Sequence, residues 1–136
     1  MKDPRFPELT QRQINTLKPF GEVECHEDGV RVFTLGDLQY DFFVVLEGGV
    51  VIQDPYNEAE IVTHYKNEFT GDSGMLSNRA AQFHAVTVGN TQVLRIVPSA
   101  LKQAIARQSD ISDVLLNAFL LRQESVLRDY TGGLKL

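Results

Sequence analysis

The chain has 136 residues, of which 43% are hydrophobic and 23% charged, a balance typical of one folded domain rather than of a disordered chain. Its net charge of −5 disfavours nucleic-acid binding, and its one cysteine, Cys25, excludes an intramolecular disulfide and is typical of a reducing compartment. No apolar run is long enough to span a bilayer, and no secretory signal is recognisable at the N-terminus. We therefore expect one cytoplasmic domain with neither nucleic-acid nor membrane partners.

The first predicted element is a short helix that begins after Thr10. Thr10 and Gln13 have the spacing of a capping box, in which each side chain bonds the backbone amide of the other residue. Pro19 and Gly21 would end this helix, and its narrow apolar stripe consists of Leu9, Ile14 and Leu17.

From Gly21 to about Ile96 the sequence predicts consecutive short strands separated by turn residues, the pattern of an antiparallel β-sandwich or jelly-roll barrel. Gly48-Gly49 and Gly89-Asn90 are predicted to form turns between strands, the second of them a tight hairpin. The predicted strands include 30–33, 42–46, 50–52, 61–64, 83–88 and 92–97.

Two helices are predicted to follow the strands. Pro98 fits the first turn of a helix over 99–107, and Ser109 or Asp110 can cap a longer one that reaches about Arg128. The longer helix has a wide apolar surface, which either packs on the barrel alone or also contacts another chain or domain; it comprises Ile111, Val114, Leu115, Leu116, Ala118, Phe119, Leu120 and Leu121. We expect a domain over 1–128, followed by a linker-like tail over 129–136 that is cut from a longer protein. Too few residues remain in this tail for a helix-turn-helix.

Three segments of the sequence resemble the cyclic nucleotide-binding domain family, whose members include catabolite activator-like sensor domains. They are the Gly36-Asp37 turn, the stretch Asp41 to Val50 and the segment Phe69-Thr70-Gly71-Asp72-Ser73-Gly74-Met75-Leu76. The order of helix, strands and two helices is also that of the family, and the resemblance covers roughly residues 6 to 122. It implies the double-stranded β-helix fold of this family.

The resemblance implies a ligand site at the family's phosphate-binding cassette, where backbone amides of a glycine turn and a very short helix face a phosphate. Asp72 would take the place of the family's glutamate, which accepts a hydrogen bond from the ribose 2′-hydroxyl. The family's phosphate-binding arginine falls near Gln82, and the adjacent hydroxyl residue becomes Phe83. Arg79, three residues earlier, either replaces that charge or is a solvated loop residue. The candidate ligand-binding residues are Gly71, Asp72, Ser73, Gly74, Met75, Arg79, Gln82 and Phe83.

Two shorter motifs, Met75-Leu76-Ser77-Asn78-Arg79 and Ala118-Phe119-Leu120-Leu121-Arg122, resemble the subset that precedes thioredoxin reductase-like flavin-dependent oxidoreductases. This implies a non-catalytic sensor domain with weak or altered cyclic nucleotide binding, and FAD and NADPH only in a longer parent protein. Its expected partners are a cyclic nucleotide or another small anion, and, through the last helix, a second copy or an attached enzymatic domain. The alternative is a competent cAMP- or cGMP-binding signalling domain.

A cupin-type metal barrel is the remaining alternative for such a pattern of strands. Cupin sites use a His-x-His pair so that side chains on one face of a strand converge on the metal, and no such pair occurs among His26, His64 and His84. Cys25 and His26 are adjacent, so they point to opposite faces of a regular strand and do not form one site. We expect no metal and no catalytic group in this chain.

Overall fold

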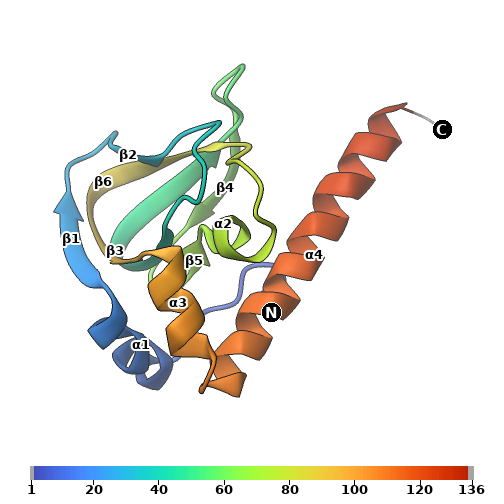
Figure 1. Cartoon of the computed structure of the whole chain (residues 1–136). Helices are drawn as coiled ribbons and strands as arrows, with labels where there is room; N and C mark the ends of the chain where they lie inside the picture. Colours follow the sequence, from blue (N-terminus) through green and yellow to red (C-terminus); the bar gives the residue numbers. More distant parts are fainter. Residues whose placement is uncertain (1, 135–136) are drawn as a thin grey trace.

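The computed structural model describes the backbone of residues 2–134 and the side chains of residues 2–123. Its strands form a six-stranded antiparallel sheet that folds into a β-sandwich, with helices α1, α3 and α4 grouped at one end and side of it (Figure 1). The predicted antiparallel β-sandwich with flanking helices is thereby confirmed. In chain order the elements are α1 (Gln11–Leu17), η1 (Lys18–Phe20), β1 (Glu22–His26), β2 (Arg31–Phe33), β3 (Phe42–Gln53), β4 (Glu60–His64), β5 (Phe69–Thr70), α2 (Asp72–Leu76), β6 (His84–Ile96), α3 (Pro98–Ile105) and α4 (Ser109–Leu134).

Two local sequence signals have the predicted outcome. The Thr10 side chain accepts a hydrogen bond from the Gln13 amide at 3.1 Å, and the Gln13 side chain accepts one from the Thr10 amide at 2.9 Å. Pro98 lies in the first turn of α3, where a backbone amide has no acceptor within the helix, so the absence of an amide hydrogen in proline loses no hydrogen bond. The helix starts of α1 and α3 are therefore set by residues next to them in the sequence.

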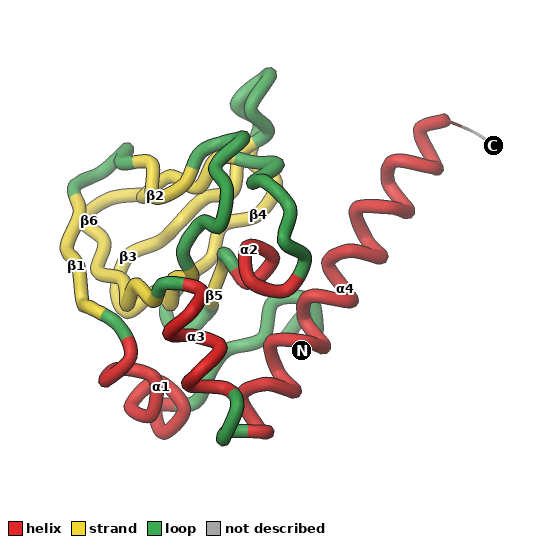
Figure 2. The backbone as a smooth tube through the Cα atoms, in the orientation of Figure 1, coloured by secondary structure: helices red, strands yellow, loops and turns green. Residues whose placement is uncertain are grey.

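The predicted turns at Gly48-Gly49 and Gly89-Asn90 are wrong, because both pairs lie inside the long strands β3 and β6. Figure 2 shows these two strands in yellow. These strands pair with each other from Phe42 opposite Ile96 to Gln53 opposite His84. The register shifts near Gly48, whose φ of 79° is used in an irregular part of the ladder rather than in a hairpin. Pairing between distant strands thus replaces the two local hairpins.

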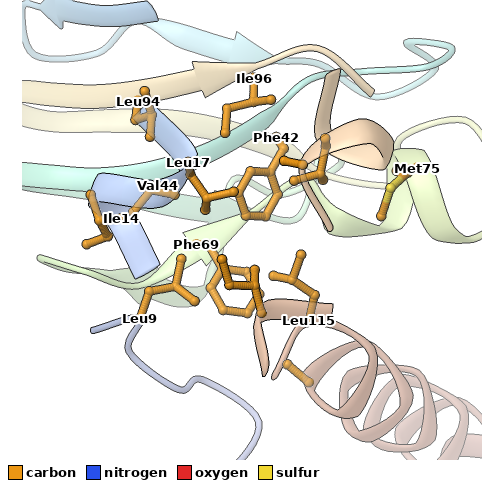
Figure 3. Close-up of a cluster of buried hydrophobic side chains, with 14 residues drawn as sticks. Leu9, Ile14, Leu17, Phe42, Val44, Phe69, Met75, Leu94, Ile96 and Leu115 are labelled. Carbon is orange, nitrogen blue, oxygen red and sulfur yellow. The ribbon is translucent and has the colours of Figure 1, made fainter. Parts of the chain in front are cut away.

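The core consists of two clusters on opposite faces of the long strands. Phe42 and Val44 of β3 point toward the helices, whereas Phe43 and Val45 point into the sandwich, as the two-residue period of a strand requires. Figure 3 shows how the helix-side cluster joins strands, helices and the N-terminal segment; its labelled members are Leu9, Ile14, Leu17, Phe42, Val44, Phe69, Met75, Leu94, Ile96 and Leu115.

Helix α4 packs one stripe on this cluster and leaves another exposed. Ile111, Leu115 and Ala118 are buried, whereas Leu116 and Leu120 are 46% and 56% exposed. The helix runs to Leu134, so the predicted end near Arg128 is wrong and part of the expected linker is helical; residues 135–136 lie outside the described residues. No helix in the described part of the chain has both the length and the apolarity needed to cross a membrane.

Replacing Leu115 by alanine is expected to lower the free energy of unfolding by about 2–5 kcal/mol, because it leaves a cavity between α4 and the core. Its neighbour Leu116 is half-exposed, so Leu116→Ala should change the free energy of unfolding by less than about 0.5 kcal/mol. Urea denaturation of both variants measures the difference. Equal losses would mean that α4 is packed through a different face.

Gly48→Ala is expected to be more destabilising than Gly29→Ala, although both glycines have a positive φ, of 79° and 80°. A Cβ at Gly48 would lie 2.5 Å from the carbonyl oxygen of Asn90, whereas nothing lies within 4 Å of one at Gly29. The positive φ alone should lower the free energy of unfolding by about 1–2 kcal/mol in either variant. The loss should be larger in Gly48→Ala, because there the neighbouring strand must also move. Thermal unfolding of both variants compares the two costs.

Candidate functional site

The segment from β5 through α2 has the geometry that the resemblance implies: a strand, a glycine turn and a very short helix. Gly71 has a φ of 85° and is the N-cap of α2. A Cβ at Gly71 would overlap the carbonyl oxygen of Asp41, so both the backbone angle and the packing require glycine here. This close approach fixes the start of α2 against the residue that precedes β3.

A cavity of about 120 Å³ lies beside this turn, and it brings together six of the predicted ligand-binding residues: Gly71, Asp72, Ser73, Arg79, Gln82 and Phe83. The other two are placed elsewhere. Met75 belongs to the helix-side core, and the space in front of Gly74 is filled by Tyr40, whose carbonyl oxygen would be 2.5 Å from a Cβ. The cavity is also lined by polar residues that are not among the predicted ligand-binding residues, namely Tyr40, Thr70, Ser77, Arg122 and Gln123.

Asp72 is the most deeply buried charged residue of this cavity wall, with only 2% of its surface exposed. Its Oδ1 accepts a hydrogen bond from Arg122 Nη1 at 2.8 Å, whereas its Oδ2 is buried without a hydrogen-bond partner among the described residues. Burial raises the pKa of Asp72, and the Arg122 guanidinium opposes this rise. An unpaired carboxylate oxygen in this position is suited to accept a hydrogen bond from a ligand.

Arg122 comes from α4 and contacts three other parts of the chain. Besides Asp72, its guanidinium donates to the carbonyl oxygens of Arg5 at 2.8 Å and of Phe69 at 3.2 Å. It also stacks over the Phe69 ring, with the Cζ atom 4.8 Å from the centroid. Arg122 thereby joins α4 to the N-terminal segment and to the wall of the cavity.

A sequence signal for Arg122 does exist. Among the α4 side chains that the structure describes, Ile111, Leu115 and Ala118 are buried, and the same spacing of four, three and four residues reaches Arg122. A charged side chain on a buried stripe requires a buried partner. This spacing alone would not have identified Asp72 as that partner.

The other cation that lines the cavity is Arg79, in the loop after α2. Its side chain is exposed and makes no ion pair with another residue of the described part of the chain. Gln82 is exposed, whereas Phe83 packs partly against the core inside the sandwich. Arg79 therefore both lines the cavity and is solvated, which is compatible with either of its predicted roles.

Tyr40 forms another polar part of the wall. Burial raises the pKa of Tyr40 to about 12, although a hydrogen bond with Ser73 lowers it in part. The phenol therefore stays protonated at neutral pH and offers both a donor and an acceptor.

A second polar cluster joins the N-terminal segment to the end of β4 and the residue that precedes β5. His64 Nδ1 lies 3.1 Å from Glu68 Oε1, and Lys2 donates to Glu68 Oε2 at 2.7 Å. Burial lowers the pKa of His64; burial raises that of Glu68, but hydrogen bonds with His64 and Lys2 outweigh it and lower the pKa overall. The rings of Phe6 and His64 pack in a T-shaped arrangement, with centroids 5.7 Å apart. These contacts hold the N-terminal segment in place beside Arg122.

The three histidines do not gather in the structure. His26 faces Glu24 on β1, His64 faces Glu68, and His84 accepts a hydrogen bond from the Leu35 amide. Among the described residues, no three His, Cys, Asp or Glu side chains are arranged to hold a metal ion. Cys25 is exposed on β1.

The chain matches no protein-family model and no curated protein sequence. It does resemble solved structures. One belongs to work on a cyclic-GMP-dependent signalling pathway that regulates bacterial phytopathogenesis, with a TM-score of 0.75 and 15% identity over 87% of this chain and 96% of the other. A transcriptional regulator from Thermotoga maritima has a TM-score of 0.72 and 17% identity over 86% and 94%.

The catabolite activator protein of Thermus thermophilus has a TM-score of 0.68 and 18% identity; the alignment covers 98% of this chain but only 62% of that protein. Identities this low establish an architecture and not an activity. Taken with the six-stranded sheet, the glycine turn and α2, these similarities show that the chain has a cyclic nucleotide-binding-like β-sandwich fold.

Proposed function

We propose that this chain is a non-catalytic regulatory domain that senses a small ligand in the cavity beside α2. The observation that carries this proposal is Asp72, whose Oδ1 is held by Arg122 and whose buried Oδ2 lacks a partner. A buried carboxylate oxygen left unpaired costs free energy, which a ligand hydroxyl could recover by donating a hydrogen bond. This agrees with the role that the resemblance implies for Asp72 toward a ribose 2′-hydroxyl.

We further propose that cyclic nucleotide binding is weak or altered. Gln82 stands where the resemblance places a phosphate-binding arginine, and Arg122 is already neutralised by Asp72. The attraction of this wall for a phosphate would then depend on Arg79, an exposed side chain whose charge is screened by water and salt. The cavity of about 120 Å³ is also smaller than the roughly 300 Å³ at which ligand pockets commonly begin, so a nucleotide would have to displace the loop around Arg79.

The second candidate is a competent cyclic nucleotide-binding signalling domain. It is favoured by the fold and by the similarity to the structure from the cyclic-GMP-dependent pathway, which makes cyclic GMP the first ligand to test. In this case Arg79 would supply the missing charge, and the cavity would open fully on binding.

Calorimetric titration of the protein with cyclic GMP and cyclic AMP distinguishes the two candidates. We expect dissociation constants weaker than about 1 μM, which corresponds to a binding free energy less favourable than about −8 kcal/mol. Any measurable binding should weaken about tenfold or more in Asp72→Asn and in Arg79→Ala, since each removes a charged hydrogen-bonding group. The control variant Arg12→Ala removes an arginine charge from the exposed side of α1, which does not line the cavity. It should bind the ligand as tightly as the unmutated protein does.

Sub-micromolar binding would contradict the first candidate and support the second. If Arg79→Ala binds as well as Arg12→Ala does, Arg79 is a solvated loop residue and not part of the site.

For the partner of this domain, we propose that the exposed stripe of α4 contacts a second copy or an attached enzymatic domain. Leu116 and Leu120 are four residues apart and both exposed, so they lie on one face of the helix. The motifs at 75–79 and 118–122 support a thioredoxin reductase-like partner domain, to which FAD and NADPH would belong. A cytoplasmic location remains a prediction from Cys25.

Light scattering tests the self-association. If two copies pair through this stripe, the protein is a dimer, and Leu120→Glu should shift it to monomer because a buried charge without a partner is costly. Asn117→Glu adds the same charge at a neighbouring exposed position outside the stripe and should leave the dimer intact. If the unmutated protein is monomeric at high concentration, the homodimer is ruled out, and an attached domain is left as the partner of the exposed stripe.

A further inference from the structure

A buried histidine lies at the end of β4, outside the cavity beside α2. His64 is the last residue of this strand, only 3% of its side chain is exposed, and it is not among the residues that line the cavity. It lies on the same face of β4 as Val62, which packs against the core inside the sandwich. An apolar side chain would be the simplest choice at such a position, because a buried imidazole loses its hydrogen bonds with water.

Residues 2–9, called here the N-terminal strap, pack against this histidine. The Phe6 ring meets the His64 ring in a T-shaped arrangement with centroids 5.7 Å apart, and Lys2 donates to Glu68 Oε2 at 2.7 Å. His64 is therefore withdrawn from water in part by the strap, and water would reach its ring if the strap moved away.

The rest of the strap is neutral and is attached through its backbone. Asp3 and Arg5 form an ion pair with each other at 2.7 Å. The Leu9 amide donates to the carbonyl oxygen of Asn67 at 2.8 Å, and the Leu9 side chain belongs to the core cluster drawn in Figure 3. The amide of Leu9 thus reports whether the strap is closed on the chain between β4 and β5.

The charges around His64 are already balanced while its ring is neutral. Its Nδ1 lies 3.1 Å from Glu68 Oε1, and because a carboxylate only accepts, the ring donates from this nitrogen. The other oxygen of Glu68 accepts the bond from Lys2. Arg122 and Asp72 also act on the ring, and they form an ion pair of their own. A proton on His64 would therefore add a buried positive charge with no counter-charge to itself.

Acid therefore acts differently on the closed and the open strap. In the closed form, burial lowers the pKa of His64, and the hydrogen bond with Glu68 opposes this only in part. In the open form, water reaches the ring, and its pKa returns toward the ordinary histidine value of about 6.5. The proton binds more tightly to the open form, so the closed form is favoured above about pH 6.5 and loses stability as the pH falls below it.

We propose that His64 is a proton-sensitive latch of the N-terminal strap. The neutral ring keeps the strap closed on the end of β4, and protonation of the ring in mild acid releases the strap. An apolar residue in this place would also pack under Phe6, but the contact would then not respond to pH. The latch requires no ligand in the cavity, so it is independent of the proposed function.

Hydrogen–deuterium exchange of the full chain at about pH 7.5 and about pH 5.5 tests the latch, after correction for the intrinsic effect of pH on exchange. We expect the amides of Phe6 and Leu9 to lose about tenfold in protection at the lower pH, because one pH unit below the pKa of the exposed ring shifts the opening equilibrium by that factor. In His64→Gln this loss should be absent, since the glutamine amide can still donate to Glu68 but does not titrate.

The matched control is His84→Gln. It removes another buried histidine, whose ring accepts a hydrogen bond from the Leu35 amide. This variant should keep the full loss of protection at Phe6 and Leu9 in acid.

Three outcomes of the exchange experiment would overturn the proposal. The first is unchanged protection of the strap amides between the two pH values. The second is a loss that persists in His64→Gln, since it would then arise from Asp72 or Glu68. The third is exchange of the strap amides at the same rate as the amides of β3, which would mean that the strap opens only when the whole domain unfolds.

NMR titration of the His64 ring is an independent test, and it decides the question if His64→Gln does not fold. In the unmutated protein the pKa of the ring should lie below about 6.5, and in Phe6→Ala it should rise toward that value because water reaches the ring. Lys2→Gln should also raise it, since Glu68 would then have only the imidazolium as a counter-charge. A pKa at or above about 6.5 in the unmutated protein, or one that Phe6→Ala leaves unchanged, would overturn the proposal.

Discussion

The pairing of β3 with β6 supports the rest of the sheet, because β1 and β2 pair with β6, and β4 and β5 pair with β3. Both long strands also carry core residues on their two faces, so one ladder aligns the cluster under the helices with the cluster inside the sandwich. The helices then pack where this ladder has placed an apolar surface. The position of the short strand β5, and with it the start of α2, is set by its two pairs with β3, Phe43 with Thr70 and Val44 with Phe69.

From this arrangement the burial of Asp72 follows. β5 fixes Thr70, the positive φ of Gly71 turns the chain, and the close approach to Asp41 leaves α2 little freedom to move outward. Asp72, the first residue of α2, is therefore forced into the interior, where an unpaired charge would be too costly. Arg122 is the counter-charge that makes this burial tolerable, and it comes from the helix that the same core cluster positions.

The parts predictable from the sequence are those that neighbouring residues decide. The capping box of Thr10, the proline start of α3 and the turn at Gly71 are local choices, and the structure has each of them. The hairpins expected at Gly48 and Gly89 failed because a positive φ fits a strand irregularity as well as a turn, and only pairing with a distant strand decides between these. The same limit applies to the candidate site: six of the residues that line the cavity are predicted from a local motif, whereas Arg122 lies 50 residues from Asp72 and is brought to it only by packing.

The charges of this site also bear on what it can select. An ion pair is neutral as a unit, so Asp72 and Arg122 together attract an anion less than a lone arginine would. The remaining lining cation, Arg79, is exposed and acts through a screened interaction. Under the proposed function, selectivity would come mainly from directional hydrogen bonds, to the unpaired Oδ2 of Asp72 and to the protonated phenol of Tyr40, and from contact with the ring of Phe83. The proposed site would therefore discriminate between ligands more by their hydroxyl groups and shape than by their negative charge, whereas a site built around a buried, unpaired arginine would select mainly for negative charge.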